Sequence, residues 1–209
     1  MLTVDLPGHG DNAPLSASLD ESAQLLADAL PKEPFILGGY SFGARVALHL
    51  ALRHPDRLTR LILLGATRGI ENPIERASRV ARDERLANRV EQIGTERFLD
   101  EWLAQPLFSS LAPDAGERAA RSRDAHGLAQ SLRHAGTGTQ AWLGEQLANC
   151  TVDTLALAGA LDEKFAREAM AIAANVTCGA FALVPGAGHA AHLERPAETA
   201  ALIDAAHPQ

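Results

Sequence analysis

The chain has 209 residues, of which 46% are hydrophobic and 22% are charged, and its formal net charge is −7. This length supports one domain with a substantial core and leaves room for a small inserted subdomain. The negative charge argues against nucleic acid or an anionic membrane as the main partner. No apolar run approaches the roughly 18 residues that a membrane span needs.

The cysteines and the amino-terminal residues indicate a cytoplasmic protein. Cys150 and Cys178 are too few for a disulfide framework and lack the spacing of metal ligands. Residues 1–10 have no basic region followed by an apolar core, so they do not match a signal peptide.

Apolar runs alternate with amphipathic stretches over the first 66 residues. We expect strands at 2–6, 35–39 and 58–66, and helices at 18–30 and 44–54. The last of these strands is continuously apolar at its centre, as a buried parallel strand should be. Strands that alternate with helices predict a parallel sheet with right-handed crossovers.

The pattern changes after this segment and later returns. Between about 67 and 148 there are only helical stretches rich in Arg, Glu, Ala and Leu. The alternation resumes with expected strands at 154–162 and 180–184 and expected helices at 163–176 and after Pro196. We predict an α/β core, residues 1–66 and 149–209, interrupted by an all-helical cap insert at 67–148.

A serine flanked by glycines lies between an expected strand and an expected helix. Residues 39–43, Gly-Tyr-Ser-Phe-Gly, have the G-x-S-x-G spacing of a nucleophile elbow, a strained turn that exposes the serine hydroxyl at the sheet edge. With 17 glycines in the chain the spacing also arises by chance. Its place between a strand and a helix, where the mechanism requires it, favours an activated Ser41.

Two further residues follow strands that end at the same sheet edge. Asp162 ends the apolar run 154–162, and His189 lies in the turn after the expected strand 180–184. The chain order Ser41, Asp162, His189 is that of α/β-hydrolases. In such a triad the histidine takes the serine proton, and the aspartate holds the imidazole tautomer.

Each of these two assignments has an alternative. Asp162 also fits the N-cap of the following helix, in which case Glu163 is the next acid. His189 also fits an ordinary loop histidine, in which case His192 is the next base. The two histidines lack a third ligand for a metal, so we expect no metal site.

The motifs together resemble the α/β-hydrolase superfamily, and within it the 2-succinyl-6-hydroxy-2,4-cyclohexadiene-1-carboxylate synthases of menaquinone biosynthesis. The matching segments are VDLPGHG (4–10), GGYSFGARVAL (38–48), ERASRVARDERLA (75–87), FLDEWLAQPLFSSL (98–111), GLAQSLRHAGTG (127–138) and GAGHAAHLERP (186–196). They extend over almost the whole chain. The elbow is generic, whereas the segments of the insert are more specific to this family.

The resemblance implies a lyase rather than a hydrolase. That family eliminates pyruvate from 2-succinyl-5-enolpyruvyl-6-hydroxy-3-cyclohexene-1-carboxylate, a small polycarboxylate, without a cofactor. By resemblance, Ser41 acts as the base that removes a ring proton, and His189 and Asp162 activate it. The backbone amide of Phe42 supplies one donor of the oxyanion hole.

The resemblance also implies arginines that bind the substrate carboxylates. Arg45 lies one helical turn after the serine, Arg79 lies in the insert, and Arg121 matches a third family arginine, with Arg123 as a competitor one register away. Guanidinium groups suit this role because they bind carboxylates in a bidentate manner.

The remaining pocket residues implied by the resemblance are Tyr40 and Trp102. Trp102 also fits the core of the insert, and Arg79 also fits a solvated helix surface, because Glu75, Arg79 and Asp83 follow an i, i+4, i+8 spacing. Tyr40 has fewer alternatives, since the position before the serine is held beside the pocket.

The sequence departs from the family at its start. The family has about three strands before VDLPGHG, and the third carries a second oxyanion-hole amide and lies between the next two strands of the sheet. We therefore expect 2–6 to pair directly with 35–39 or to leave backbone groups unpaired, and we expect that Met1 is an internal position or a misplaced start.

Two other functions remain open at this point. The same scaffold serves serine esterases and thioesterases, and a truncated homologue without turnover would also keep these motifs. Three arginines for a polyanionic substrate favour the lyase over an esterase with a neutral substrate. The sequence does not indicate an oligomeric state.

Overall fold

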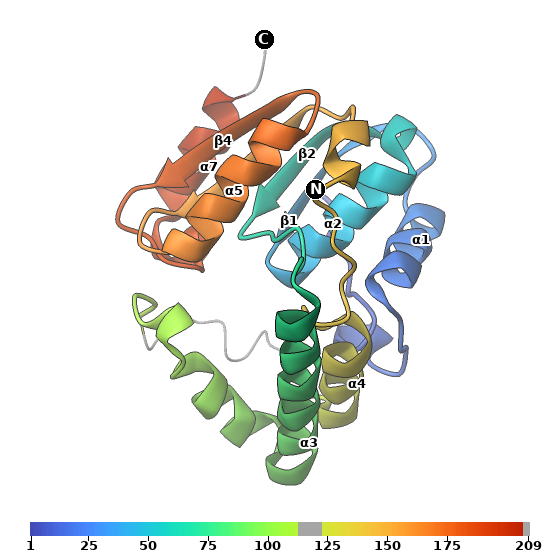
Figure 1. The fold of residues 1–209 in the computed structure, drawn as a ribbon, viewed down its shortest axis with the longest axis vertical. Helices are drawn as coiled ribbons and strands as arrows, with labels where there is room; N and C mark the ends of the chain where they lie inside the picture. The colour runs from blue at the N-terminus through green and yellow to red at the C-terminus, as the bar shows by residue number, and fades with distance from the viewer. Residues whose placement is uncertain (113–122, 207–209) are drawn as a thin grey trace. The chain divides into compact units, whose positions relative to one another are not determined.

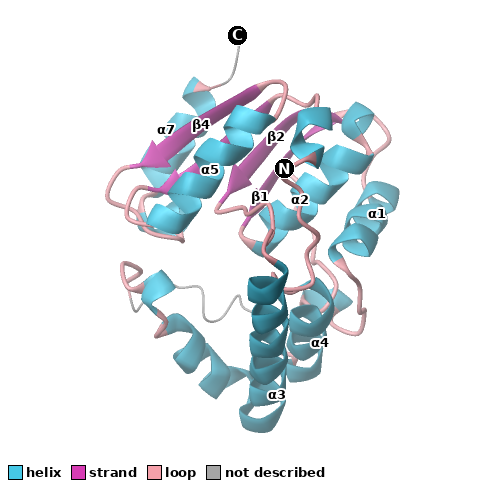
Figure 2. Cartoon of the chain, in the orientation of Figure 1, coloured by secondary structure: helices cyan, strands magenta, loops and turns pink. Residues whose placement is uncertain are grey.

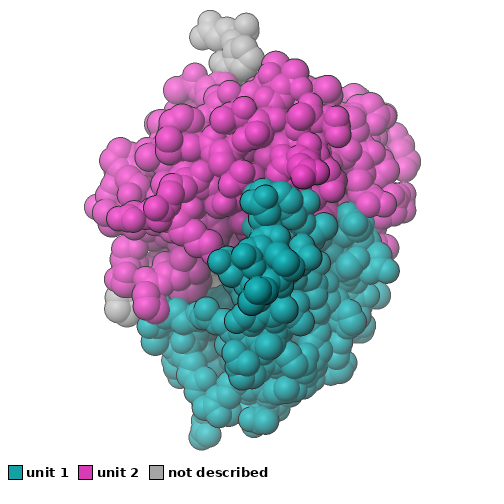
Figure 3. All heavy atoms as spheres, viewed as in Figure 1, with its two compact units in different colours: residues 1–22, 69–105, 114–142 teal, residues 23–68, 106–113, 143–209 magenta. Residues whose placement is uncertain are grey.

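The computed structural model of the protein describes residues 1–112 and 123–206. It forms two compact units, coloured separately in Figure 3. Unit 1 consists of residues 1–22, 69–105 and 114–142, and unit 2 consists of residues 23–68, 106–113 and 143–209.

This grouping differs from the predicted core and insert at residues 1–22 and 106–113, and at the short boundary segments 67–68 and 143–148. Residues 1–22 belong to the helical unit, because the turn at Gly8 lies directly against Gly127 in that unit. Residues 106–113 belong to the sheet unit, where Ser110 lies directly against Gly188. Neither association has a local signal in the sequence.

Unit 2 contains a parallel sheet of four strands, which confirms the predicted α/β class (Figures 1 and 2). In spatial order the strands are β1 (Phe35–Tyr40), β2 (Leu58–Leu64), β3 (Thr154–Gly159) and β4 (Gly179–Val184). β3 is buried along its whole length, so it is apolar on both faces, as expected for an inner parallel strand.

Helices cover both faces of this sheet. α2 (Phe42–Arg53) packs against β1 and β2, and α5 (Glu163–Asn175) packs against β3 and β4. On the opposite face from α5, α7 (Pro196–Ala205) covers a cluster built on Leu155 and Leu157 (Figure 1). Alternate side chains of β3 therefore supply two cores, because successive residues of a strand point to opposite faces.

Short elements connect the strands and long helices. They are α6 (Ala191–Glu194) and the 3-10 helices Gly10–Asn12, Pro55–Arg57, Pro106–Phe108 and Gln146–Asn149. α1 (Leu19–Ala29) begins with a capping box, in which Ser18 Oγ accepts from the Glu21 amide and the Glu21 carboxylate accepts from the Ser18 amide.

The regular elements of unit 1 among its described residues are all helices, as predicted for the insert. α3 (Pro73–Leu103) packs against α4 (Ala125–Ala135), and Gly94, at φ 74°, kinks α3. Their shared core includes Ala87, Val90, Phe98 and Ala129. In residues 1–112 and 123–206 no helix combines the length and apolarity needed to cross a membrane.

The predicted strand at 2–6 is wrong. These residues form no strand and are largely exposed. Instead, Asp5 holds the following turn, since its carboxylate accepts from the Asp11 amide at 3.0 Å and its carbonyl accepts from Asn12 Nδ2 at 2.6 Å. A short apolar run becomes a strand only beside a partner, and β1 pairs only with β2 among the described residues.

We expect Leu157→Ala to lower the free energy of unfolding by about 2–5 kcal/mol, because it opens a cavity in the cluster under α7. Leu161→Ala, the same change at a side chain that is 63% exposed, should cost far less. Urea unfolding of both variants measures the difference. Equal midpoints would contradict the assignment of Leu157 to the core.

Candidate active site

Ser41 occupies a strained turn between β1 and α2. Its backbone has φ 50° and ψ −106°, and among the described residues no other non-glycine has a positive φ. Two hydrogen bonds hold the turn: the Ser41 amide donates to the Leu64 carbonyl at 2.8 Å, and the Arg45 amide donates to the Ser41 carbonyl at 3.1 Å. Such strain persists only where the surroundings enforce it.

The two glycines of the elbow have different tasks. A Cβ on Gly39 would lie 2.5 Å from the carbonyl carbon and oxygen of Gly43, whereas a Cβ on Gly43 would meet nothing within 4 Å. Gly39 is therefore required where the first turn of α2 lies directly on the end of β1. No neighbouring atom would clash with a side chain at position 43, so the packing does not require glycine there.

The structure brings Ser41, Asp162 and His189 together within unit 2. His189 Nδ1 lies 2.9 Å from Asp162 Oδ2, and His189 Nε2 lies 3.1 Å from Ser41 Oγ. A carboxylate only accepts hydrogen bonds, so the imidazole proton belongs on Nδ1. Nε2 is then the acceptor for the serine hydroxyl, which is the arrangement of a general base.

Three aromatic rings pack against the imidazole and cover much of its surface. The ring centroids of Phe165, Tyr40 and Phe108 lie 4.4, 5.3 and 6.0 Å from that of His189. The side chains of His189 and Asp162 are 2% and 8% exposed. A buried charge-assisted hydrogen bond is stronger than one in water.

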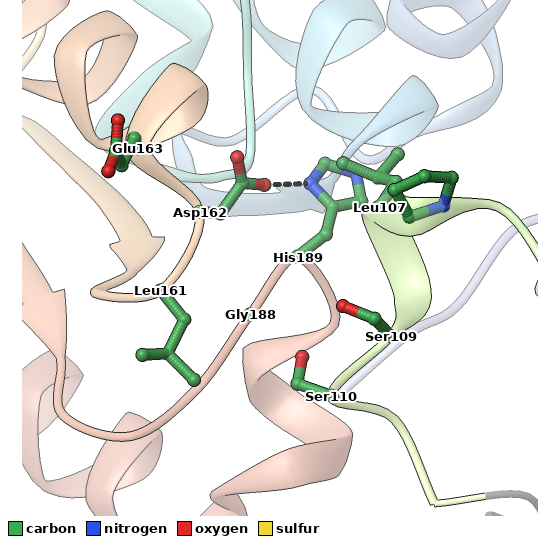
Figure 4. A pocket seen from close by; sticks show the side chains of 9 residues that line it. Leu107, Ser109, Ser110, Leu161, Asp162, Glu163, Gly188 and His189 are labelled. Atoms are coloured by element: carbon green, nitrogen blue, oxygen red, sulfur yellow. Dashed lines mark hydrogen bonds and ion pairs between the residues drawn. The ribbon is translucent and has the colours of Figure 1, made fainter.

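Asp162 makes the contacts that both of its interpretations require. One carboxylate oxygen faces His189, while the other accepts from the Phe165 amide at 3.2 Å and caps α5. Glu163, the alternative acid, lies farther from the imidazole than Asp162 (Figure 4) and is 3.7 Å from Arg167. His192, the alternative base, packs against Tyr40 with ring centroids 4.3 Å apart.

A cavity of about 250 Å³ adjoins the imidazole and the carboxylate (Figure 4). Its lining residues are Pro106, Leu107, Ser109, Ser110, Leu161, Asp162, Glu163, Gly188 and His189. Sequence reasoning included 106–110 in a family-matching segment but did not place it at the site, and it missed the ring of Phe165. Phe165 has one local signal: it is the residue that Asp162 caps.

The expected substrate residues of unit 2 lie around the elbow. Arg45 is only 9% exposed, and its guanidinium carbon lies 5.4 Å from the ring centre of Phe42. Phe42 begins α2, so its amide is one of the first four of the helix, which have no acceptor within the helix. Tyr40 packs between His189 and His192.

The expected substrate residues of unit 1 have partners within that unit. Arg79 Nε donates to Asp83 Oδ1 at 2.7 Å, and Trp102 stacks on Phe98 at 5.8 Å as part of the shared core. Arg121 lies outside the described residues. Its competitor Arg123 is exposed, and its carbonyl accepts from Thr95 Oγ1 at 3.4 Å.

The described residues hold no group of three or more His, Cys, Asp or Glu side chains arranged for a metal ion.

We expect Gly39→Ala to lower the free energy of unfolding by about 1–3 kcal/mol, because the added methyl overlaps the first turn of α2. Gly43→Ala is the matched control and should leave stability unchanged or raise it slightly, since its methyl has open space. Denaturant titrations of both variants decide the point. A stable Gly39→Ala would show that the elbow is not tightly packed.

Known proteins resemble this chain in sequence and in fold. A family model described as the alpha/beta hydrolase family matches residues 1–202. The 2-succinyl-6-hydroxy-2,4-cyclohexadiene-1-carboxylate synthase of Enterobacter sp. (strain 638) is 34% identical over 209 residues, which cover 97% of this chain and 79% of that protein.

Two solved structures extend the comparison. The structure of MenH from S. aureus has a TM-score of 0.90 and 32% identity, and the match covers 98% of this chain and 81% of that one. A thermophilic esterase from Thermogutta terrifontis, with malate bound, has a TM-score of 0.79 and 26% identity, and the match covers 96% and 76%. Sequence and fold agree, and the chain belongs to the alpha/beta hydrolase family.

Proposed function

We propose that this protein is a carbon–oxygen lyase of menaquinone biosynthesis that eliminates pyruvate from 2-succinyl-5-enolpyruvyl-6-hydroxy-3-cyclohexene-1-carboxylate. The family and the names of its relatives support an enzyme. The observation that carries the proposal is the hydrogen-bonded series Asp162–His189–Ser41, at 2.9 and 3.1 Å, in a chain 34% identical to a protein named for this reaction's product.

The series supplies a base. His189 Nε2 accepts the Ser41 hydroxyl proton while Asp162 stabilises the imidazolium that forms. Ser41 Oγ then removes the ring proton beside the succinyl ketone. The electrons of the broken carbon–hydrogen bond form a new ring double bond, the existing ring double bond moves by one carbon, and the carbon–oxygen bond to the enolpyruvyl group breaks. The enolpyruvate takes the proton held by His189 and becomes pyruvate.

Negative charge develops on the ketone oxygen when the ring proton leaves. The Phe42 amide, at the amino end of α2, is the donor that this chain offers for that charge, and the helix dipole adds to it. A positioned base contributes about 10²- to 10⁴-fold, and loss of one oxyanion donor costs about 10²- to 10³-fold. Both contributions therefore matter for turnover.

Arginines are the proposed partners of the substrate carboxylates. Arg45 emerges from the first turn of α2, four residues after the serine, and is almost buried. Burial strengthens an ion pair with a carboxylate that displaces water from it. We assign Arg79, Arg121, Tyr40 and Trp102 to the same substrate by resemblance to the family.

Replacing Ser41 by alanine should strongly reduce catalysis of this reaction. We expect pyruvate release above the spontaneous rate from freshly generated substrate, falling by about 10²-fold or more in Ser41→Ala, because the base is lost. A coupled lactate dehydrogenase assay measures pyruvate. Equal rates with both proteins, each at the spontaneous level, would contradict the proposed reaction and favour a homologue without turnover.

Replacing Arg79 by glutamine should raise KM by about tenfold or more with little change in kcat, because a substrate carboxylate loses its charged partner. Glutamine keeps an N–H that can donate to Asp83, which is only 2% exposed, so the fold should persist. Arg85→Gln, at an exposed position on the same helix, is the control. A KM equal to that of Arg85→Gln would remove Arg79 from the substrate site.

A serine esterase is the second candidate function, favoured by the strained elbow and by the similarity to an esterase at 26% identity. An esterase would form an acyl–Ser41 intermediate and release p-nitrophenol from p-nitrophenyl acetate in a burst. We expect the lyase to show slow release without accumulation of an acyl-enzyme. Mass spectrometry of the quenched protein distinguishes the two.

A further inference from the structure

The turn that carries His189 joins β4 to α6. It follows β4, passes through Gly186 at φ 67°, and reaches the imidazole in the next three residues. A backbone hydrogen bond ties the turn to the residues after β3: the Leu161 amide donates to the Ala187 carbonyl at 2.8 Å. The turn also lies so close to the end of β3 that a Cβ on Gly159 would overlap the Gly188 carbonyl.

A single carboxylate holds the backbone on both sides of the histidine. Glu194 Oε2 accepts from the Gly188 amide at 2.8 Å, and Glu194 Oε1 accepts from the Ala190 amide at 3.1 Å. The two donors are the amides that flank His189. Glu194 is placed for this by the one turn of α6, whose last amide donates back to the Ala190 carbonyl at 3.0 Å.

A second side chain fixes the helix turn that presents the carboxylate. Thr199 Oγ1, buried in α7, donates to the Ala191 carbonyl at 3.1 Å or to the Arg195 carbonyl at 2.8 Å. The position of Glu194 is thus tied to α7, which packs against β4. The carboxylate therefore connects the imidazole turn to the body of the sheet unit.

We infer that Glu194 is a positioning residue, whose carboxylate fixes the turn at residues 188–190 and so directs the His189 imidazole toward Ser41 and Asp162. Each of the two N–H donors has its own acceptor oxygen here, and a carboxylate is the side-chain group that presents two acceptor oxygens together. Glutamine offers one oxygen and would turn an NH₂ group toward the second amide. Aspartate keeps both oxygens but is one methylene shorter.

The inference concerns the site of the proposed function, but its test does not use that reaction. Diisopropyl fluorophosphate reports on the triad directly: Ser41 Oγ bonds to phosphorus, fluoride leaves, and His189 takes the hydroxyl proton. The second readout is the proton NMR signal of the His189 Nδ1–H that donates to Asp162. Unfolding midpoints are measured for each variant, and rates are normalised to folded protein.

We expect Glu194→Gln to slow the phosphorylation of Ser41 by about 10²-fold, as a displaced catalytic group does, and to broaden or shift the Nδ1–H signal. Glu194→Asp should fall between wild type and Glu194→Gln, and it decides the matter if Glu194→Gln does not fold. Glu198→Gln, the same charge change at an exposed position in the first turn of α7, should match wild type.

The inference is overturned if folded Glu194→Gln, or folded Glu194→Asp in its place, reacts at the wild-type rate with an unchanged Nδ1–H signal. A carboxylate that only stabilised the fold would lower the unfolding midpoint without changing either readout. If the wild type is phosphorylated at Ser41 but releases no pyruvate, the proposed function fails while the inference about Glu194 stands. If the wild type is not phosphorylated, the Nδ1–H signal alone decides.

Discussion

The backbone turn at Ser41 is the constraint on which the site depends. Its amide donates to the Leu64 carbonyl at the end of β2, and the next residue, Gly65, donates to the Leu157 carbonyl of β3. Backbone hydrogen bonds therefore connect the elbow through the end of β2 to β3, the strand that Asp162 follows. Because all four strands are parallel, their carboxyl ends meet at one edge, and residues far apart in sequence converge there.

Close backbone approaches set the distances within this edge. Gly39 lies against α2, Gly159 lies against the histidine turn, and a Cβ on Gly65 would come within 2.9 Å of the imidazole. Larger residues at these places would push the side chains of Ser41, Asp162 and His189 apart. The strain at Ser41, of order 1–3 kcal/mol, is offset by the burial of α2, whose Val46, Leu48 and Leu50 are completely enclosed.

The two side chains of the Arg79–Asp83 ion pair differ in their exposure to solvent. An i, i+4 pair on a charged helix is typical of a solvated surface. Here the Asp83 carboxylate is 2% exposed and also accepts from the Gly138 amide at 3.1 Å, while the Arg79 side chain is 27% exposed. The aspartate is therefore a buried anchor that orients the half-buried guanidinium.

The sequence by itself determined the order of strands and helices, the elbow, and the residues at strand ends, because hydrophobic period, caps and glycine spacing are local properties. It placed Asp162 and His189 after the correct strands, it predicted the long helices of the α/β segments, and it predicted the helical character of the insert without the bounds of α3 and α4. Only the tertiary structure decided that 2–6 is not a strand, that Phe108 and Phe165 enclose the imidazole, and that Glu194 binds the amides beside it. Whether 2–6 forms a strand, and which aromatic rings meet the imidazole, depends on segments distant in sequence. Glu194 lies within six residues of both amides that it binds, but this contact depends on how the turn folds, which the residue types alone do not predict.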